Sequence, residues 1–180
     1  MLALVLGEAA SGKSEFAEQL AMSLADERYY IATMQVSDPE SQQRLERHRQ
    51  MRQGKGFVTL EQPLALAELR LQPKKTGAVA LLECASTLLG NELYLPGGTG
   101  PDSWQAIWSG VQNLLNQDVQ VVVVSNSVFT EGAVSVLSSE MQEYLFQLGL
   151  LNCRLAQAAD QVVEVCCGLP LYHKKMGENC

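Results

Sequence analysis

A short phosphate-loop motif directly after an apolar run constrains the fold of this chain more than any other feature of its sequence. Residues 2–6 are all apolar, which is typical of a strand buried on both faces of a parallel sheet. The pattern G-x-x-x-x-G-K-S follows, and residues 16–24 then place an apolar stripe on one face of a helix. Because this motif needs a strand before it and a helix after it, the segment predicts a nucleotide-binding α/β unit.

The residue types in the loop account for its expected chemistry. Its members are Gly7, Glu8, Ala9, Ala10, Ser11, Gly12, Lys13 and Ser14. Glycines let successive backbone N–H groups turn toward phosphates, and the helix N-terminus adds positive potential. We expect Lys13, on the surface of the loop, to contact the β- and γ-phosphates, and the Ser14 hydroxyl to bind Mg²⁺. The alternative is a plain strand-to-helix turn with an exposed lysine.

The rest of the chain continues the alternation of strands and helices. Buried or alternating apolar runs predict strands at 29–33, 57–60, 79–82, 119–124 and 162–166. Helical spacing predicts helices at 39–53, 63–71, 85–95, 104–115 and 134–160, the last one interrupted at Gly149. This order favours an α/β fold with a largely parallel sheet flanked by helices. A length of 180 residues fits a single domain spanning 1–180.

Composition excludes several classes of protein. Thirteen basic and twenty acidic residues give a net charge of -7, which opposes general binding to nucleic acid or anionic lipid. The five cysteines are odd in number and show no C-x-x-C pair, so we expect reduced thiols. No apolar run approaches the roughly 20 residues of a membrane span. These features predict a cytoplasmic protein without an integral membrane segment.

Glu83 is the first candidate functional residue outside the loop, as a carboxylate that supports Mg²⁺. It ends the buried run 79–82, where P-loop proteins place a carboxylate that supports Mg²⁺. The alternative is a solvated acid at the end of a strand.

A basic segment with one histidine is the second candidate. Residues 40–55 carry five basic and two acidic side chains, and helical spacing places Arg44, Arg47 and Arg52 around His48. Such a face suits phosphate, and the neighbouring arginines favour a neutral, nucleophilic imidazole. The alternative is a solvated helix face. The other histidine, His173, has no motif around it and is interpreted as surface or tail.

Several segments together resemble the bifunctional adenosylcobinamide kinase/adenosylcobinamide-phosphate guanylyltransferase family. The family segment R-[IL]-x-x-H-[RK] is similar to residues 44–49. Further similar segments occur in family order along nearly the whole chain: the P-loop at 7–14, Tyr30-Ile31-Ala32-Thr33, Thr59-Leu60-Glu61, Leu81-Leu82-Glu83-Cys84 with Thr87 and Asn91, Val124-Ser125-Asn126, and Asn152-Cys153-Arg154-Leu155-Ala156.

The resemblance implies a RecA-like P-loop fold, a homotrimer and two reactions on a corrinoid. ATP or GTP first phosphorylates adenosylcobinamide, and the family's histidine then carries GMP from GTP to that phosphate, giving adenosylcobinamide-GDP. It implies that His48 is the guanylylated nucleophile, that Gly12, Lys13 and Ser14 bind phosphate, and that Ser14 and Glu83 serve Mg²⁺. The remaining residues assigned to nucleotide binding are Arg44, Arg47, Arg49, Arg52 and Glu61.

The chain departs from the family pattern around both the loop and the long helix. The family's G-G-x-[RK]-S-G-K-S has Glu8 and Ala10 here, and its N-E-V-G has Ser127 and Phe129. The stretch R-x-F-R-D is replaced at 142–146. Two other functions are weighed beside the family's: a small-molecule P-loop kinase without a covalent intermediate, and a nucleotide-binding scaffold without turnover.

Overall fold

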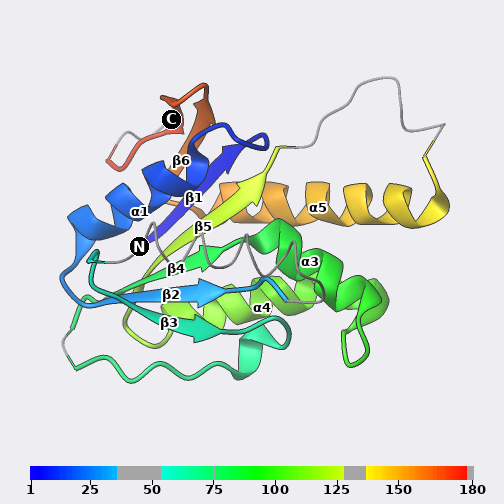
Figure 1. Cartoon of the computed structure of the whole chain (residues 1–180), viewed down its shortest axis with the longest axis horizontal. Coiled ribbons are helices and arrows are strands. Elements are labelled where there is room, and N and C mark those ends of the chain that lie inside the picture. The colour runs from blue at the N-terminus through cyan, green and yellow to red at the C-terminus, as the bar shows by residue number, and fades with distance from the viewer. Residues whose placement is uncertain (36–53, 75, 128–136, 178–180) are drawn as a thin grey trace.

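A seven-stranded sheet organises the computed structural model, which describes residues 1–35, 54–74, 76–127 and 137–177 (Figure 1). The strands lie in the order β3-β2-β4-β5-β1-β6-β7. Their bounds are β1 Leu2–Gly7, β2 Arg28–Ala32, β3 Phe57–Glu61, β4 Val79–Glu83, β5 Gln120–Asn126, β6 Gln161–Cys166 and β7 Leu169–Lys174. The helices are α1 Lys13–Leu24, α3 Ala85–Tyr94, α4 Ser103–Leu115 and α5 Ser139–Ala158, with 3₁₀ turns η1 Leu66–Glu68 and η2 Gly100–Asp102.

Strands β1 to β6 run parallel, and only β7 is antiparallel to its neighbour. The register pairs Gly7 with Asn126 and Ala32 with both Glu61 and Glu83. The carboxyl ends of these strands therefore meet at one edge of the sheet, where open α/β sheets bind their ligands.

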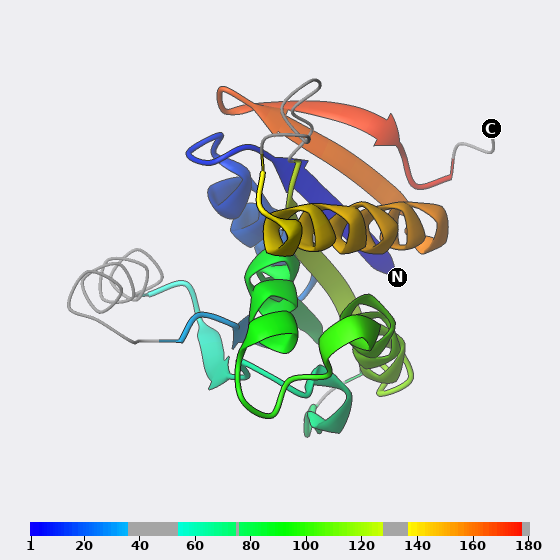
Figure 2. The ribbon, with the colours of Figure 1, turned by 90° about the vertical axis from the view of Figure 1, so that its right-hand side faces the viewer.

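The sheet lies between helix α1 on one face and helices α3, α4 and α5 on the other (Figures 1 and 2), and an apolar layer fills each side. On one face, Ala17 and Ala21 of α1 pack against Val5 and Val122. On the other, helices α3, α4 and α5 pack against β1, β4 and β5, and Ile107 of α4 is buried in this layer. The central strands are buried on both sides, which is why they are nearly continuous apolar runs. No helix among the described residues is both long and apolar enough for a bilayer.

The expected helix at 63–71 is wrong, because only one 3₁₀ turn forms there. Side chains from α4 and from the turn that follows it take hydrogen bonds that a longer helix would need. The Asn113 amide donates to the Ala67 carbonyl at 3.0 Å, and the Gln117 side chain accepts from the backbone N–H of Leu71 at 2.7 Å. A tertiary contact thus replaces the local helix.

The predicted start and interruption of the long helix are also wrong. Leu137 and Ser138 are not helical, and the Ser138 hydroxyl accepts from the backbone N–H of Met141 at 3.3 Å as an N-cap. Helix α5 then continues through Gly149 without a break. Residues 134–136 of the predicted helix, and the whole predicted helix at 39–53, lie outside the described residues.

The sheet does not end at 166 as expected, because β6 turns back into β7. Cys167 (φ 51°) and Gly168 (φ 78°) form a two-residue turn with positive φ at both positions, as tight hairpins require. His173 is consequently part of a strand and not of a tail, and its Nε2 lies 2.9 Å from Glu164 Oε2. The expected free thiols are found at Cys84, Cys153, Cys166 and Cys167.

Two glycines in helices provide a matched test of the packing. A Cβ at Gly110 of α4 would lie 2.7 Å from both Cβ and Cγ of the buried Leu66, whereas one at Gly149 would meet nothing within 4 Å. We expect Gly110→Ala to lower the free energy of unfolding by about 1–3 kcal/mol, because overpacking moves backbone or side chains. Gly149→Ala should raise it by up to about 1 kcal/mol through helix propensity. Urea unfolding measures both, and an equal effect of the two variants would contradict this packing.

Candidate nucleotide-binding site

The phosphate-loop motif forms the connection between β1 and α1, at the carboxyl edge of the sheet (Figure 1). Two positions require glycine for different reasons. A Cβ at Gly7 would lie 2.4 Å from Ser11 Oγ and 2.7 Å from the carbonyl oxygen of Val165. Gly12 has a φ of 92°, which L side chains rarely adopt, and directly precedes helix α1. Gly7 is required because neighbouring atoms leave no room for a Cβ, and Gly12 is required because of its positive φ.

Lys13 is buried against the loop and does not lie on its surface as expected. Its relative exposure is 9%, and its Nζ donates a 2.9 Å hydrogen bond to the carbonyl oxygen of Glu8. This bond holds the ammonium at the loop backbone. The alternative of an exposed lysine on a plain turn is therefore not what the structure shows.

Ser14 and Glu83 meet although 69 positions separate them in the chain. The Ser14 hydroxyl donates to Glu83 Oε1 at 2.7 Å. Hydroxyl and carboxylate oxygens are the hard donors that Mg²⁺ prefers, and Mg²⁺ in such sites takes few protein ligands and completes its shell with phosphate oxygens and water. The described residues contain no cluster of three or more His, Cys, Asp or Glu side chains suited to a metal. The Ser14–Glu83 pair presents one hydroxyl and one carboxylate oxygen, donors of the kind that Mg²⁺ accepts.

The β6–β7 hairpin supports the loop from behind, a contact that sequence reasoning missed. The backbone N–H of Gly168 donates to the Ser11 carbonyl at 2.8 Å, and a Cβ at Gly12 would lie 3.3 Å from the Gly168 Cα. The neighbouring Cys166 has a raised thiol pKa, mainly because of its hydrogen bond with Cys167, with Glu164 and Glu8 adding negative charge. The glycine after two cysteines was the available sequence signal for this turn.

Other sequence-predicted residues lie at different distances from the loop. The backbone N–H of Ser127 donates to the Gly7 carbonyl at 3.2 Å, so this departure from the family pattern adjoins the loop. Glu61 shares the same sheet edge, but β2, β4 and β5 separate its strand from β1, which corresponds to about 19 Å at the usual strand spacing. The structure therefore places Glu61 away from the phosphate loop but only two strands from Glu83, because Ala32 pairs with both residues, and this corresponds to about 10 Å at the same spacing. Six residues named in the sequence analysis lie outside the described part of the chain: Arg44, Arg47, His48, Arg49, Arg52 and Phe129.

Tyr144, within the altered stretch 142–146, contacts the first turn of helix α3. Its hydroxyl donates to the Ser86 carbonyl at 3.2 Å, and burial raises its pKa to about 12. The phenol is therefore neutral at pH 7. It lines an almost wholly apolar hollow of about 300 Å³ together with Tyr94 of α3 and Met141 of α5.

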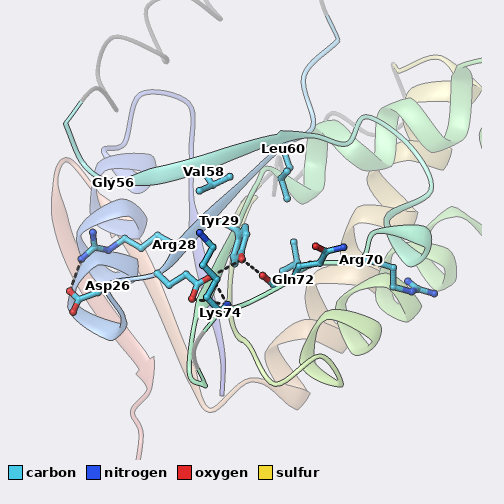
Figure 3. Close-up of a pocket in the computed structure, with 11 residues that line it drawn as sticks. Asp26, Arg28, Tyr29, Gly56, Val58, Leu60, Arg70, Gln72 and Lys74 are labelled. Carbon is cyan, nitrogen blue, oxygen red and sulfur yellow. Dashed lines mark hydrogen bonds and ion pairs between the residues drawn. The ribbon is translucent and has the colours of Figure 1, made fainter.

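A larger hollow of about 640 Å³ lies beside the amino-terminal part of β2 and along β3 (Figure 3). Tyr29 projects into it, with its hydroxyl 2.7 Å from Glu27 Oε1 and 3.1 Å from the Gln72 carbonyl. Burial first, and then the Glu27 carboxylate, raises the pKa of Tyr29 to about 12. Neither hollow includes a residue of the phosphate loop.

Comparisons of the amino-acid sequence with a family model and with known proteins all point to one family. A family model described as cobinamide kinase / cobinamide phosphate guanyltransferase matches residues 3–172. The bifunctional adenosylcobalamin biosynthesis protein CobU of Escherichia coli is 36% identical, over 94% of this chain and 97% of that protein. CobP of Pseudomonas aeruginosa, with the same description, is 32% identical over 93% and 94%, and CobU of Salmonella typhimurium is 31% identical over 94% and 97%.

A solved structure supports the fold. A prototypical ATPase from a bacterial type III secretion system matches with a TM-score of 0.52 and 9% identity, covering 91% of this chain and 50% of that chain. This chain thus spans about half the length of that ATPase. At this level of identity the likeness concerns the fold alone, and it confirms the predicted RecA-like P-loop architecture with a mostly parallel sheet.

Proposed function

The chain belongs to the cobinamide kinase / cobinamide phosphate guanyltransferase family, and from this premise we propose how its residues divide the two reactions. The enzyme acts in cobalamin biosynthesis as a kinase and nucleotidyltransferase. The observation that carries the assignment of roles is the Ser14–Glu83 hydrogen bond at the end of a glycine-dependent phosphate loop.

In the first reaction, the hydroxyl of adenosylcobinamide attacks the γ-phosphate of ATP or GTP. The new O–P bond forms as the bond to the nucleoside diphosphate breaks. Backbone N–H groups of residues 7–14 and the Lys13 ammonium bind the β- and γ-phosphates, since positioning and charge neutralisation supply most of this catalysis. Mg²⁺ held by Ser14 and Glu83 would neutralise charge on the same phosphates when bound.

In the second reaction, His48 attacks the α-phosphate of GTP and expels pyrophosphate. The resulting N–P bond holds GMP on the imidazole until a phosphate oxygen of adenosylcobinamide phosphate displaces it, which releases His48 and forms adenosylcobinamide-GDP. A covalent nucleophile of this kind divides one difficult transfer into two easier ones. Arg44, Arg47, Arg49 and Arg52 neutralise phosphate charge in this proposal, and Glu61 contacts the nucleotide.

Labelling with radioactive GTP tests the covalent step against its alternatives. Protein incubated with α-labelled GTP and Mg²⁺ should acquire label that is acid-labile and base-stable, as a phosphoramidate is. A small-molecule P-loop kinase would turn over substrate without such label, and a nucleotide-binding scaffold would bind GTP tightly without forming product. Either result would contradict the proposed His48 chemistry.

The departures from the family pattern lead to a prediction about the two activities. Glu8 adds an acid beside the phosphates, Ala10 lacks the family's basic side chain, and Ser127 replaces an acid next to Gly7. We expect phosphorylation of adenosylcobinamide to be slower than GMP transfer by about 10-fold or more, because proton transfer and charge compensation at the γ-phosphate both weaken. Steady-state assays with adenosylcobinamide plus ATP, and with its phosphate plus GTP, measure the ratio. Comparable turnover would show that other residues compensate.

The remaining proposals concern the setting of the enzyme. We propose that residues 1–180 act as one nucleotide-binding domain, that the protein forms a homotrimer and that it works in the cytoplasm. The four described free thiols are consistent with a reducing compartment. Sedimentation of the purified enzyme tests the trimer directly.

A further inference from the structure

A buried hydroxyl contacts the backbone of Glu83 and of the residue that follows it. Thr33 follows β2 and has no exposed surface. Its Oγ1 accepts a 2.8 Å hydrogen bond from the backbone N–H of Cys84, and it lies 3.0 Å from the carbonyl oxygens of both Glu83 and Cys84, to which it can donate. The Thr33 backbone N–H also donates to the Glu83 carbonyl at 3.1 Å. Thr33 therefore holds the backbone on both sides of the peptide that follows Glu83.

Helix α3 in turn anchors Thr33. The side-chain amide of Asn91 donates to the Thr33 carbonyl at 2.8 Å and to the Pro63 carbonyl at 3.0 Å. This amide joins the segments that follow β2 and β3, while Thr33 joins the end of β2 to that of β4. Thr33 is consequently held in place independently of anything bound at the loop.

These hydrogen bonds lie where the parallel ladder stops. The β2–β4 register ends with Ala32 opposite Glu83, and beyond this pair the last backbone bond between the two segments is the one from the Thr33 N–H to the Glu83 carbonyl. A carboxylate that supports a hard cation needs its backbone and side chain held within a fraction of an ångström of the working geometry. The Thr33 hydroxyl pairs the first backbone N–H beyond the ladder, immediately after the residue whose Oε1 contacts Ser14.

We propose that Thr33 is a positioning residue whose hydroxyl orients the Glu83 carboxylate for Mg²⁺-dependent nucleotide binding. This inference rests on the proposed assignment of Ser14 and Glu83 to Mg²⁺. Thr33 does not touch the nucleotide in this scheme; it acts through the backbone of Glu83 and Cys84.

The test compares nucleotide affinity with and without Mg²⁺. Isothermal titration with a non-hydrolysable GTP analogue, in excess Mg²⁺ and again in EDTA, gives two dissociation constants, and their ratio is the Mg²⁺ enhancement. Thr33→Ser keeps the hydroxyl and should retain the wild-type ratio within about 2-fold. Thr33→Val, which keeps the shape and loses the hydroxyl, should lower the ratio by about 10-fold with little change in EDTA. Thr33→Ala leaves room for a water to pair with the Cys84 N–H, so it offers a second, more tolerant variant with the same expected direction.

Glu83→Gln separates failure of this inference from failure of the metal site. If the wild type shows no enhancement, or Glu83→Gln retains it, the proposed metal assignment is wrong. If Glu83→Gln loses the enhancement while Thr33→Val keeps it, the metal site stands and the positioning role is overturned. A lower melting temperature with an unchanged ratio would equally overturn the positioning role of Thr33, since a purely structural hydroxyl would act on stability alone.

Discussion

Lys13→Ala should weaken GTP binding by about 100-fold while leaving the fold intact. Lys13 is buried at the loop and its ammonium donates to the Glu8 carbonyl, so the charge lies beside the backbone groups that are proposed to receive phosphate. Removing a charge-assisted contact to phosphate costs about 1.5–3 kcal/mol, and a 100-fold loss corresponds to about 2.7 kcal/mol. The substitution should weaken nucleotide binding more than it lowers the stability of the free protein. In the free protein it removes only one hydrogen bond, from Lys13 Nζ to the Glu8 carbonyl. Isothermal titration gives the affinity, and circular dichroism checks the fold.

Lys74→Ala is the matched control for this variant. Lys74 is an exposed lysine of the larger hollow, remote from the loop, and the same change of charge there should leave GTP affinity within about 2-fold. A Lys13→Ala protein with wild-type affinity would remove the phosphate-loop assignment. An equal loss in both variants would show that net charge, and not the loop, governs binding.

His48→Asn should eliminate the covalent GMP adduct and keep GTP binding. The amide of asparagine retains hydrogen bonding but lacks a nucleophilic nitrogen lone pair, so the N–P bond cannot form. GMP transfer should fall by at least about 10⁴-fold, which is the scale seen when a covalent nucleophile is removed. The measurement is the acid-labile label from α-labelled GTP, together with turnover of adenosylcobinamide phosphate.

His173→Asn serves as the control, because His173 is the only other histidine of the chain. Its imidazole pairs with Glu164 across the β6–β7 hairpin, on an exposed part of the sheet. This variant should label like the wild type. Label that survives in His48→Asn but disappears in His173→Asn would transfer the nucleophile's role to the hairpin, and label that survives in both would assign it to a residue that is not histidine.

Local patterns in the sequence were sufficient for much of the site. The phosphate loop could be predicted because its glycines, lysine and serine are consecutive and its strand and helix adjoin it. Glu83 could be proposed for the metal because a buried apolar run ends at that residue. The chain's own order of strands and helices also predicted the fold class, since burial on both faces leaves a continuous apolar run in each central parallel strand.

Long-range contacts decided what local patterns could not. The 3₁₀ turn at Leu66–Glu68 replaces a helix because α4 side chains bond its backbone, and the hairpin behind the loop depends on positive φ at Cys167 and Gly168. The distance of Glu61 from the loop follows from strand order, which no periodicity in the sequence reveals.

By itself, the sequence determined the phosphate loop, the alternation of elements and the candidate residues, because each depends on neighbours within a few positions. Only the tertiary structure decided that Ser14 touches Glu83, that Thr33 holds the backbone beyond it and that Gly168 supports Ser11. These contacts join residues at or just beyond the carboxyl ends of different strands. They form because the order and register of a parallel sheet bring the carboxyl ends of distant segments to one edge, and that pairing is set by the packing of the whole chain.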